Sequence, residues 1–115
     1  MSKLVLIMLA SFGFSNFYTQ CPPGEVEVTV SVTTDNWGYE CYWELHPVGN
    51  NCGDATVIFA GGNTNVGCSG GGGQSAAAGD PGAYASNATV TEGPWCLVDG
   101  ADYVIHEVDD WGDGA

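Results

Sequence analysis

The last residues of the chain form an acidic segment with the composition of a cation-binding loop. Positions 108–114 read V-D-D-W-G-D-G, so carboxylates stand among residues that favour tight turns. Asp109, Asp113 and Gly114 match the first, fifth and sixth positions of an EF-hand calcium loop, but Trp111 occupies the third. The segment is therefore no EF-hand. Its chemistry still suits Ca²⁺, which takes about six to eight oxygen ligands.

A second copy of this pattern occurs earlier in the chain. D-N-W-G at 35–38 lies 74 positions before D-D-W-G at 109–112, and each follows a run typical of a β-strand. Two copies are too few for a solenoid, which needs at least about three stacked units. They predict two similar corners at one end of a domain. The corners would lie together if the first and last strands are neighbours, which is the arrangement that Greek-key connections produce.

Corners that meet would place four carboxylates around one calcium ion. The predicted ligands are Asp35, Glu40, Asp109 and Asp113. Without a cation such a group would be repulsive, because neighbouring like charges raise each other's pKa. The alternative is that these Asp and Gly residues are ordinary turn formers.

The runs that position these corners have the patterns of β-strands. Valines at 26, 28, 30 and 32 alternate with polar residues, a period of two typical of a half-buried strand. Residues 39–46 are predicted to return as the second strand of a hairpin. Further strands are predicted at 56–60, 88–91, 95–98 and 103–108, with a break at Gly93–Pro94 and a long irregular glycine-rich segment over 61–82.

Short strands separated by turns predict an all-β domain over residues 21–115. No helical pattern appears in this range, which favours an antiparallel β-sandwich of the jelly-roll or Ig-like type. The last strand runs into the acidic loop and the sequence stops at Ala115, so we expect the sandwich to be incomplete at its C-terminus.

Residues 1–20 have the composition of an export signal peptide. Lys3 is basic, and Leu4 to Ala10 form an apolar run that is too short to span a bilayer. A lipid anchor on Cys21 is less consistent, because residues 18–20 lack the small side chains expected before a lipidated cysteine. A buried N-terminal helix also fits poorly beside the strand patterns. We expect a secreted or cell-surface protein.

The charge balance excludes several partners. The chain has one Lys and no Arg against fourteen Asp and Glu, a formal charge of −13, and removal of the N-terminus with Lys3 leaves −14 (0 minus 14). Such a surface repels nucleic acid, and it disfavours anionic membrane surfaces for the same reason. Cations are its natural counter-species. Disorder is disfavoured, because 44% of the residues are hydrophobic and 11% are aromatic.

Five cysteines in an exported chain predict disulfides and one remaining thiol. The expected pairs are Cys52 with Cys68, which closes a loop at the glycine-rich segment, and Cys21 with Cys96, which joins the lead-in to a late strand. The spacing leaves other connectivities open, and Cys41 is the candidate for the spare thiol. Zinc is disfavoured because no C-x₂-C pair is present and the two histidines stand apart in the sequence.

Signatures of catalysis are lacking. The chain contains no G-x-S-x-G, no H-E-x-x-H and no P-loop lysine. Glu40 and Asp109 could act as an acid and base pair, as in glycoside hydrolysis, but residues 21–115 leave little room for a substrate cleft. We therefore expect a protein that is not an enzyme.

The four tryptophans divide by their predicted positions. Trp43 and Trp95 lie on strand-like segments and are expected to fill the core. Trp37 and Trp111 lie at the corners, so they are the candidates for stacking on sugar rings, as in carbohydrate-binding modules.

Four segments together resemble a module of secreted bacterial surface proteins. They are V-E-V-T-V-S-V-T-T-D-N-W-G-Y-E at 26–40, Y-W-E-L at 42–45, T-E-G-P-W-C-L at 91–97 and D-D-W-G-D-G at 109–114. The resemblance implies a β-sandwich that serves as a repeat or accessory domain of large exported proteins. Position 41 of that pattern more usually carries a small hydroxyl residue, so Cys41 departs from it.

These observations predict a non-catalytic adhesion or structural module, stabilised by calcium. Its expected partners are an extracellular glycan or protein, or neighbouring modules of the same protein. The alternative, from a different class, is a carbohydrate-binding module appended to an extracellular enzyme.

Overall fold

The computed structural model describes residues 21–70 and 75–113 and contains two β-sheets. The predicted signal peptide, residues 1–20, and Gly114 lie outside the described residues. The elements in chain order are β2 (Glu25–Thr33), η2 (Gly38–Glu40), β3 (Cys41–Pro47), β4 (Phe59–Gly62), η3 (Gly67–Ser69), β5 (Thr89–Val98) and β6 (Tyr103–Asp109), where η denotes a 3₁₀ turn. The prediction of an all-β chain is confirmed for these residues. None of their helical turns is long and apolar enough to cross a membrane.

The chain divides into two compact units. The smaller comprises the described residues up to Val28 together with Pro94–Asp99. Within it, the predicted disulfide between Cys21 and Cys96 is present with its Cα atoms 5.4 Å apart, and Asp99 N donates a hydrogen bond to Gly24 O. The larger unit comprises Thr29–Gly93 and the described residues from Gly100 onward.

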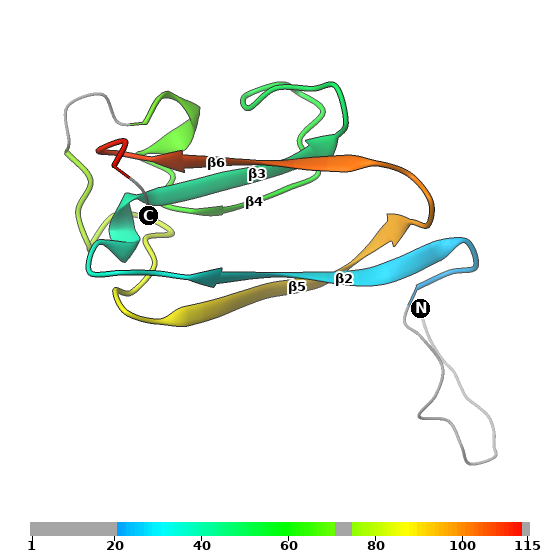
Figure 1. The fold of residues 1–115 in the computed structure, drawn as a ribbon, viewed down its shortest axis with the longest axis horizontal. Coiled ribbons are helices and arrows are strands. Elements are labelled where there is room, and N and C mark those ends of the chain that lie inside the picture. The colour runs from blue at the N-terminus through cyan, green and yellow to red at the C-terminus, as the bar shows by residue number, and fades with distance from the viewer. Residues whose placement is uncertain (1–20, 71–74, 114–115) are drawn as a thin grey trace, which may run out of the picture. The chain divides into compact units, whose positions relative to one another are not determined.

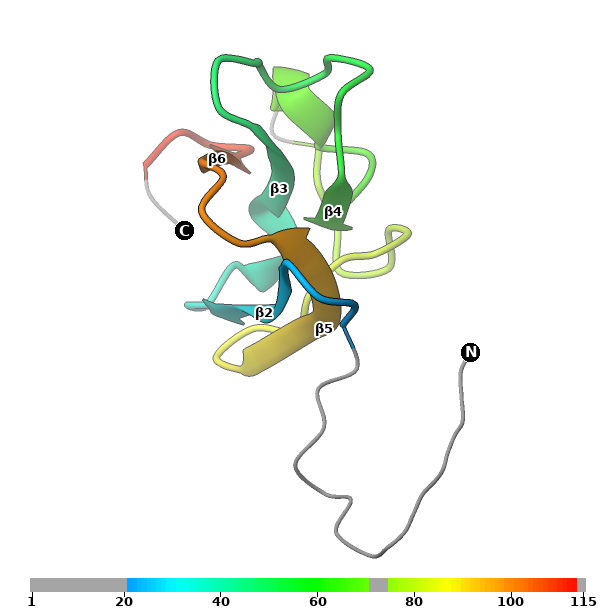
Figure 2. The same ribbon diagram turned by 90° about the vertical axis from the view of Figure 1, so that its right-hand side faces the viewer.

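The three-stranded sheet lies wholly in the larger unit, in the order β4-β3-β6 (Figures 1 and 2). β3 is the central strand and pairs antiparallel with both neighbours. Its alternate residues Cys41, Trp43 and Leu45 are buried, and so are Glu44 and His46 on its other face. β3 is therefore covered on both sides, by apolar contacts on one and by a polar network on the other.

The predicted hairpin between residues 26–32 and 39–46 is wrong. β2 pairs with β5 instead, and the Ser31 and Thr91 hydroxyls lie 3.2 Å apart across this pair. The reason lies just after β2, where Thr34 N donates to Ala88 O and the Thr34 hydroxyl donates to Ala85 O. These bonds hold the chain against the segment before β5, so the next strand joins the other sheet.

β5 is also longer than predicted, because it continues through Gly93 and Pro94. Proline removes a backbone donor, but strand edges tolerate this loss. Among residues 21–70 and 75–113, β5 pairs with β2 alone, so one side of β5 lies outside this ladder.

The core of the larger unit is built around Trp43, whose Nε1 donates to the Tyr84 hydroxyl at 2.9 Å. The Tyr84 hydroxyl donates in turn to Glu92 Oε2 on β5 at 2.9 Å. A Cβ atom on Gly61 would lie 2.6 Å from Trp43 Nε1, so only glycine lets β4 approach the indole. Part of the glycine-rich segment is thus packed rather than irregular. Trp43 fills the core as predicted, whereas Trp95 is only half-buried.

The second predicted disulfide, Cys52–Cys68, is present with its Cα atoms 5.6 Å apart, and Cys41 is the free thiol.

Burial raises the pKa of Cys41 to about 11, with smaller effects from the charges of Glu107 and Asp109. Thiol reagents attack the thiolate. We therefore expect iodoacetamide to leave Cys41 unlabelled in the folded protein and to label it after denaturation without reductant, as read by mass spectrometry. Reduced and denatured protein, with all five cysteines labelled, is the control, and rapid native labelling would contradict this expectation.

Candidate metal centre

The two D-[DN]-W-G corners approach one another through the pairing of β3 with β6. η2 ends at Glu40 and leads directly into β3, where Cys41 pairs with Asp109 at the end of β6. Asp110 N then donates to Glu40 O at 3.0 Å. Both corners lie at the left end of the sheet in Figure 1. The expected route, with the first strand beside the last, is wrong, because β6 pairs with β3 and β2 pairs with β5.

Three of the four predicted ligands converge at this end of the sheet. Glu40, Asp109 and Asp113 each offer a carboxylate oxygen within 4.8 Å of the other two. Glu40 is buried, Asp109 is half-buried and Asp113 is exposed. The turn that returns Asp113 is closed by two bonds: Gly112 N donates to Asp109 O, and Asp113 N donates to Asp109 Oδ2 at 2.9 Å.

The proximity of these carboxylates changes the protonation of Glu40. Burial, the charge of Asp109 and a hydrogen bond between the two side chains together raise the pKa of Glu40 from 4.5 to about 7, and burial is the largest of these causes. Asp113 and Asp110 add smaller repulsive contributions. Near pH 7, therefore, either Glu40 keeps a proton or it adds a negative charge to the group, and a bound cation would neutralise that charge.

Asp110 is a fourth carboxylate at this corner, and sequence reasoning did not include it among the ligands. Its side chain is only 6% exposed, and Oδ2 accepts a hydrogen bond from Ala76 N at 3.2 Å. Oδ1 is buried without a hydrogen-bond partner among the described residues. An orphaned buried oxygen is costly. In the first D-[DN]-W-G corner the position equivalent to Asp110 is Asn36. The repeated pattern therefore indicates a turn residue at this position and not a ligand.

Asp35 does not join this group. Its Oδ1 accepts a hydrogen bond from Trp37 N at 2.7 Å, and its carbonyl accepts one from Asn87 N at 2.7 Å. Asp35 therefore shapes the turn that carries Trp37, which is a common role of Asp before a turn.

The two predicted stacking residues lie at the same hollow. Trp37 is 52% exposed and Trp111 is 57% exposed. The hollow has a volume of about 400 Å³ and is lined by Trp37, Tyr39, Glu40, Ala76, Trp111 and Asp113. The Trp37 and Tyr39 rings make an edge-to-face contact with centroids 6.1 Å apart. Two of the three clustered carboxylates thus share a groove with two exposed indoles.

A buried amide holds the first corner in place. Asn63 is fully buried, and its Nδ2 donates to Tyr39 O at 2.8 Å and to Asp80 Oδ2 at 2.9 Å. On the other side, a Cβ atom on Gly38 would collide with the Ala85 carbonyl, so this position requires glycine. Sequence reasoning missed Asn63, because an Asn inside a glycine-rich segment indicates a turn.

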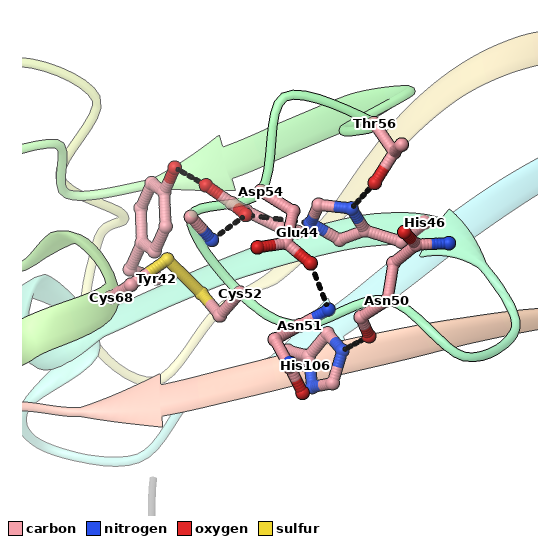
Figure 3. The surroundings of a disulfide bond; sticks show 11 residues. Tyr42, Glu44, His46, Asn50, Asn51, Cys52, Asp54, Thr56, Cys68 and His106 are labelled. Atoms are coloured by element: carbon pink, nitrogen blue, oxygen red, sulfur yellow. Dashed lines mark hydrogen bonds and ion pairs between the residues drawn. A yellow bond between two sulfur atoms is a disulfide. The ribbon is translucent and has the colours of Figure 1, made fainter.

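A second polar cluster, centred on Glu44, supports the other end of β3 (Figure 3). Glu44 Oε2 accepts from the Tyr42 hydroxyl at 2.7 Å, and Oε1 accepts from Gly53 N at 2.8 Å and from His46 Nε2 at 2.7 Å. Burial raises the pKa of Glu44, but the bonds from Gly53, His46 and Tyr42 outweigh it and lower the pKa overall. Glu44 also lies within 4.8 Å of both Cys52 and Cys68 sulfurs, which are engaged in their disulfide.

The histidines of this cluster are neighbours although they stand apart in the sequence. Their rings pack edge to face with centroids 5.6 Å apart. His46 Nδ1 lies 3.1 Å from the Thr56 hydroxyl, and His106 Nε2 lies 2.8 Å from Asn50 O. Together with Glu44, these bonds fasten the loop after β3 to the sheet, so the cluster has the character of a structural support.

No protein-family model, curated protein or solved structure gives a significant match to this chain. The functional argument therefore depends on the geometry of the site.

Proposed function

We propose that this chain is a non-catalytic β-sandwich module of a secreted or cell-surface protein that serves adhesion or extracellular architecture and is stabilised by calcium. One observation carries the proposal: the carboxylates of Glu40, Asp109 and Asp113 lie within 4.8 Å of one another. Beyond Lys3 the sequence has no Lys or Arg that could compensate them. A divalent cation supplies the missing positive charge.

The donor set favours calcium over other common divalent ions. All side-chain donors at the corner are oxygens, which suit the hard cations Ca²⁺ and Mg²⁺, whereas zinc prefers nitrogen and sulfur. Calcium also accepts flexible, irregular geometry, while magnesium demands a near-octahedral arrangement. Asp113 is exposed, and Asp110 brings a further buried oxygen without a partner in the described structure.

Three observations support an extracellular location. The disulfides Cys21–Cys96 and Cys52–Cys68 are typical of an oxidising compartment. Residues 1–20 have the composition of a signal peptide. The resemblance to modules of bacterial surface proteins agrees with both, and it favours a repeat or accessory domain whose partners are neighbouring modules, extracellular proteins or glycans.

Calorimetry and thermal unfolding with calcium or chelator test the proposal. We expect calcium to bind with an affinity typical of extracellular modules, a Kd of about 10⁻⁴–10⁻³ M. A free concentration about 100 times the Kd stabilises the folded state by about 2.7 kcal/mol, which raises the Tm of a domain of this size by roughly 10 °C or more.

Two variants make this test specific. Glu40→Gln should abolish calcium binding but leave the calcium-free protein folded, because it removes a repelled charge without changing the side-chain shape. Asp102→Asn removes an exposed carboxylate outside the group and should keep the full calcium response. A wild-type protein with no binding heat and the same Tm in calcium and chelator would refute the calcium site.

A further inference from the structure

The groove beside the carboxylates is lined by two largely exposed tryptophans. Single exposed apolar side chains are normal on protein surfaces. Trp37 and Trp111, however, come from two corners 74 positions apart and line the same hollow, each with more than half of its surface exposed. Burying either ring in the core would be the stabilising choice, because aromatic side chains contribute most when they are buried.

The Trp37 ring is held in position, and the backbone turn that carries Trp111 is closed by hydrogen bonds. Asp35 fixes the turn before Trp37 through the bond from Trp37 N, and the Tyr39 ring packs edge to face against the Trp37 ring. Trp111 lies between Asp110 and Gly112 in the turn closed by Gly112 N and Asp109 O. Aromatic side chains around a few polar groups are the usual composition of a small-ligand site, and about 400 Å³ falls within the range of such sites.

We propose that this groove binds a neutral saccharide, with a sugar ring packed on Trp37 or Trp111 and vicinal hydroxyls coordinated by the calcium ion. This inference rests on the calcium site proposed above. The flat C–H face of a sugar ring suits an indole face, and its hydroxyls suit the oxygen-rich end of the same groove, where Glu40 and Asp113 lie.

The coordination number of calcium leaves room for this ligand. The ion takes about six to eight oxygens, and the corner offers three clustered side-chain carboxylates, two of which line the groove. Positions filled by water in the free protein could therefore be taken by two adjacent hydroxyls. The surrounding charge selects for neutral sugars, because fourteen acidic residues without a Lys or Arg beyond Lys3 repel anionic polysaccharides.

The test measures binding of neutral oligosaccharides built from mannose, galactose or glucose, by calorimetry in calcium and in chelator. We expect at least one of them to bind in calcium and to lose binding in chelator. Trp37→Ala and Trp111→Ala should each weaken this binding about tenfold or more, the loss typical of an aromatic anchor, without changing the calcium affinity. Trp111→Phe should restore part of it, and Val48→Ala, an exposed apolar control outside the groove, should have no effect.

The outcomes separate this inference from the calcium site. Calcium binding with no saccharide binding across the panel would overturn the inference and leave the calcium site standing. Saccharide binding that persists in chelator, that ignores both tryptophan substitutions or that is confined to anionic polysaccharides would overturn it as well. Failure of calcium itself to bind would refute both proposals together.

Discussion

The calcium-free protein should be most stable near about pH 4.5 to 5 and should lose stability as the pH rises toward 7. The folded state raises the pKa of Glu40 from 4.5 to about 7, so between these values the folded chain binds more protons than the unfolded chain. By linkage, the free energy of unfolding then falls with increasing pH. Glu44 acts in the opposite sense below pH 4.5, because its pKa is lowered in the folded state and its stabilising contribution is lost on acidification.

Calcium should counteract the loss of stability between about pH 5 and pH 7. A bound cation holds Glu40 in its charged form, so the calcium-dependent increase in Tm should grow as the pH rises from about 5 to about 7, following the titration of the carboxylate. Circular dichroism melts over this range, with calcium and with chelator, measure both effects. Each kcal/mol corresponds to roughly 4–8 °C for a domain of this size.

The control is again a pair of matched variants. Glu40→Gln should flatten the calcium-free profile between pH 5 and 7, whereas Asp102→Asn should reproduce the profile of the wild-type chain. A wild-type Tm that rises through this window in chelator would contradict the role assigned to Glu40.

The second large effect is expected at Glu44, where substitution by Ala should lower the free energy of unfolding by about 3 kcal/mol or more. The carboxylate accepts bonds from Tyr42, Gly53 and His46. The bond from His46 is buried and those from Tyr42 and Gly53 are part-buried, and a buried donor left without an acceptor costs about 1–3 kcal/mol. A small domain has only about 5–15 kcal/mol of stability in total, so this single change removes a large share.

Urea unfolding of the purified variants measures this loss. Glu44→Gln keeps the shape and one acceptor oxygen, so its loss should be smaller than that of Glu44→Ala. Glu107→Ala removes an exposed carboxylate from the neighbouring strand and should change stability by less than about 0.5 kcal/mol. Equal losses for Glu44→Ala and Glu107→Ala would mean that the Glu44 cluster contributes nothing beyond its charge.

Local patterns in the sequence predict where the strands lie better than they predict which strands pair with one another. The alternating valines placed β2 to within a residue at each end, because period-two burial is a property of one strand alone. They carried no information about the neighbouring strand, which depends on distant bonds such as those of Thr34 with Ala85 and Ala88. The hairpin prediction failed for this reason.

The same division applies to the candidate site. Repetition of D-[DN]-W-G indicated that the two corners are alike, and Trp37 and Trp111 do line one hollow. The roles of Asn63 and Asp110 could not be predicted from the sequence, because they depend on burial by segments far away in the sequence. Asp35 occupies in the first corner the position that Asp109 occupies in the second, but it lies outside the group of clustered carboxylates, which local sequence alone does not indicate.

The two disulfides make the stability of the fold depend on the redox state of its surroundings. In the reducing, calcium-poor cytoplasm, neither Cys21–Cys96 nor Cys52–Cys68 would form and the proposed cation would be scarce. Glu44 would then lie beside two thiols rather than a closed loop, and Glu40 would face Asp109 without a counter-ion. If the chain is secreted and binds calcium as proposed, the folded state would gain stability only outside the cell, where both disulfides form and the cation binds. The stability of the folded state would thus differ between the inside and the outside of the cell.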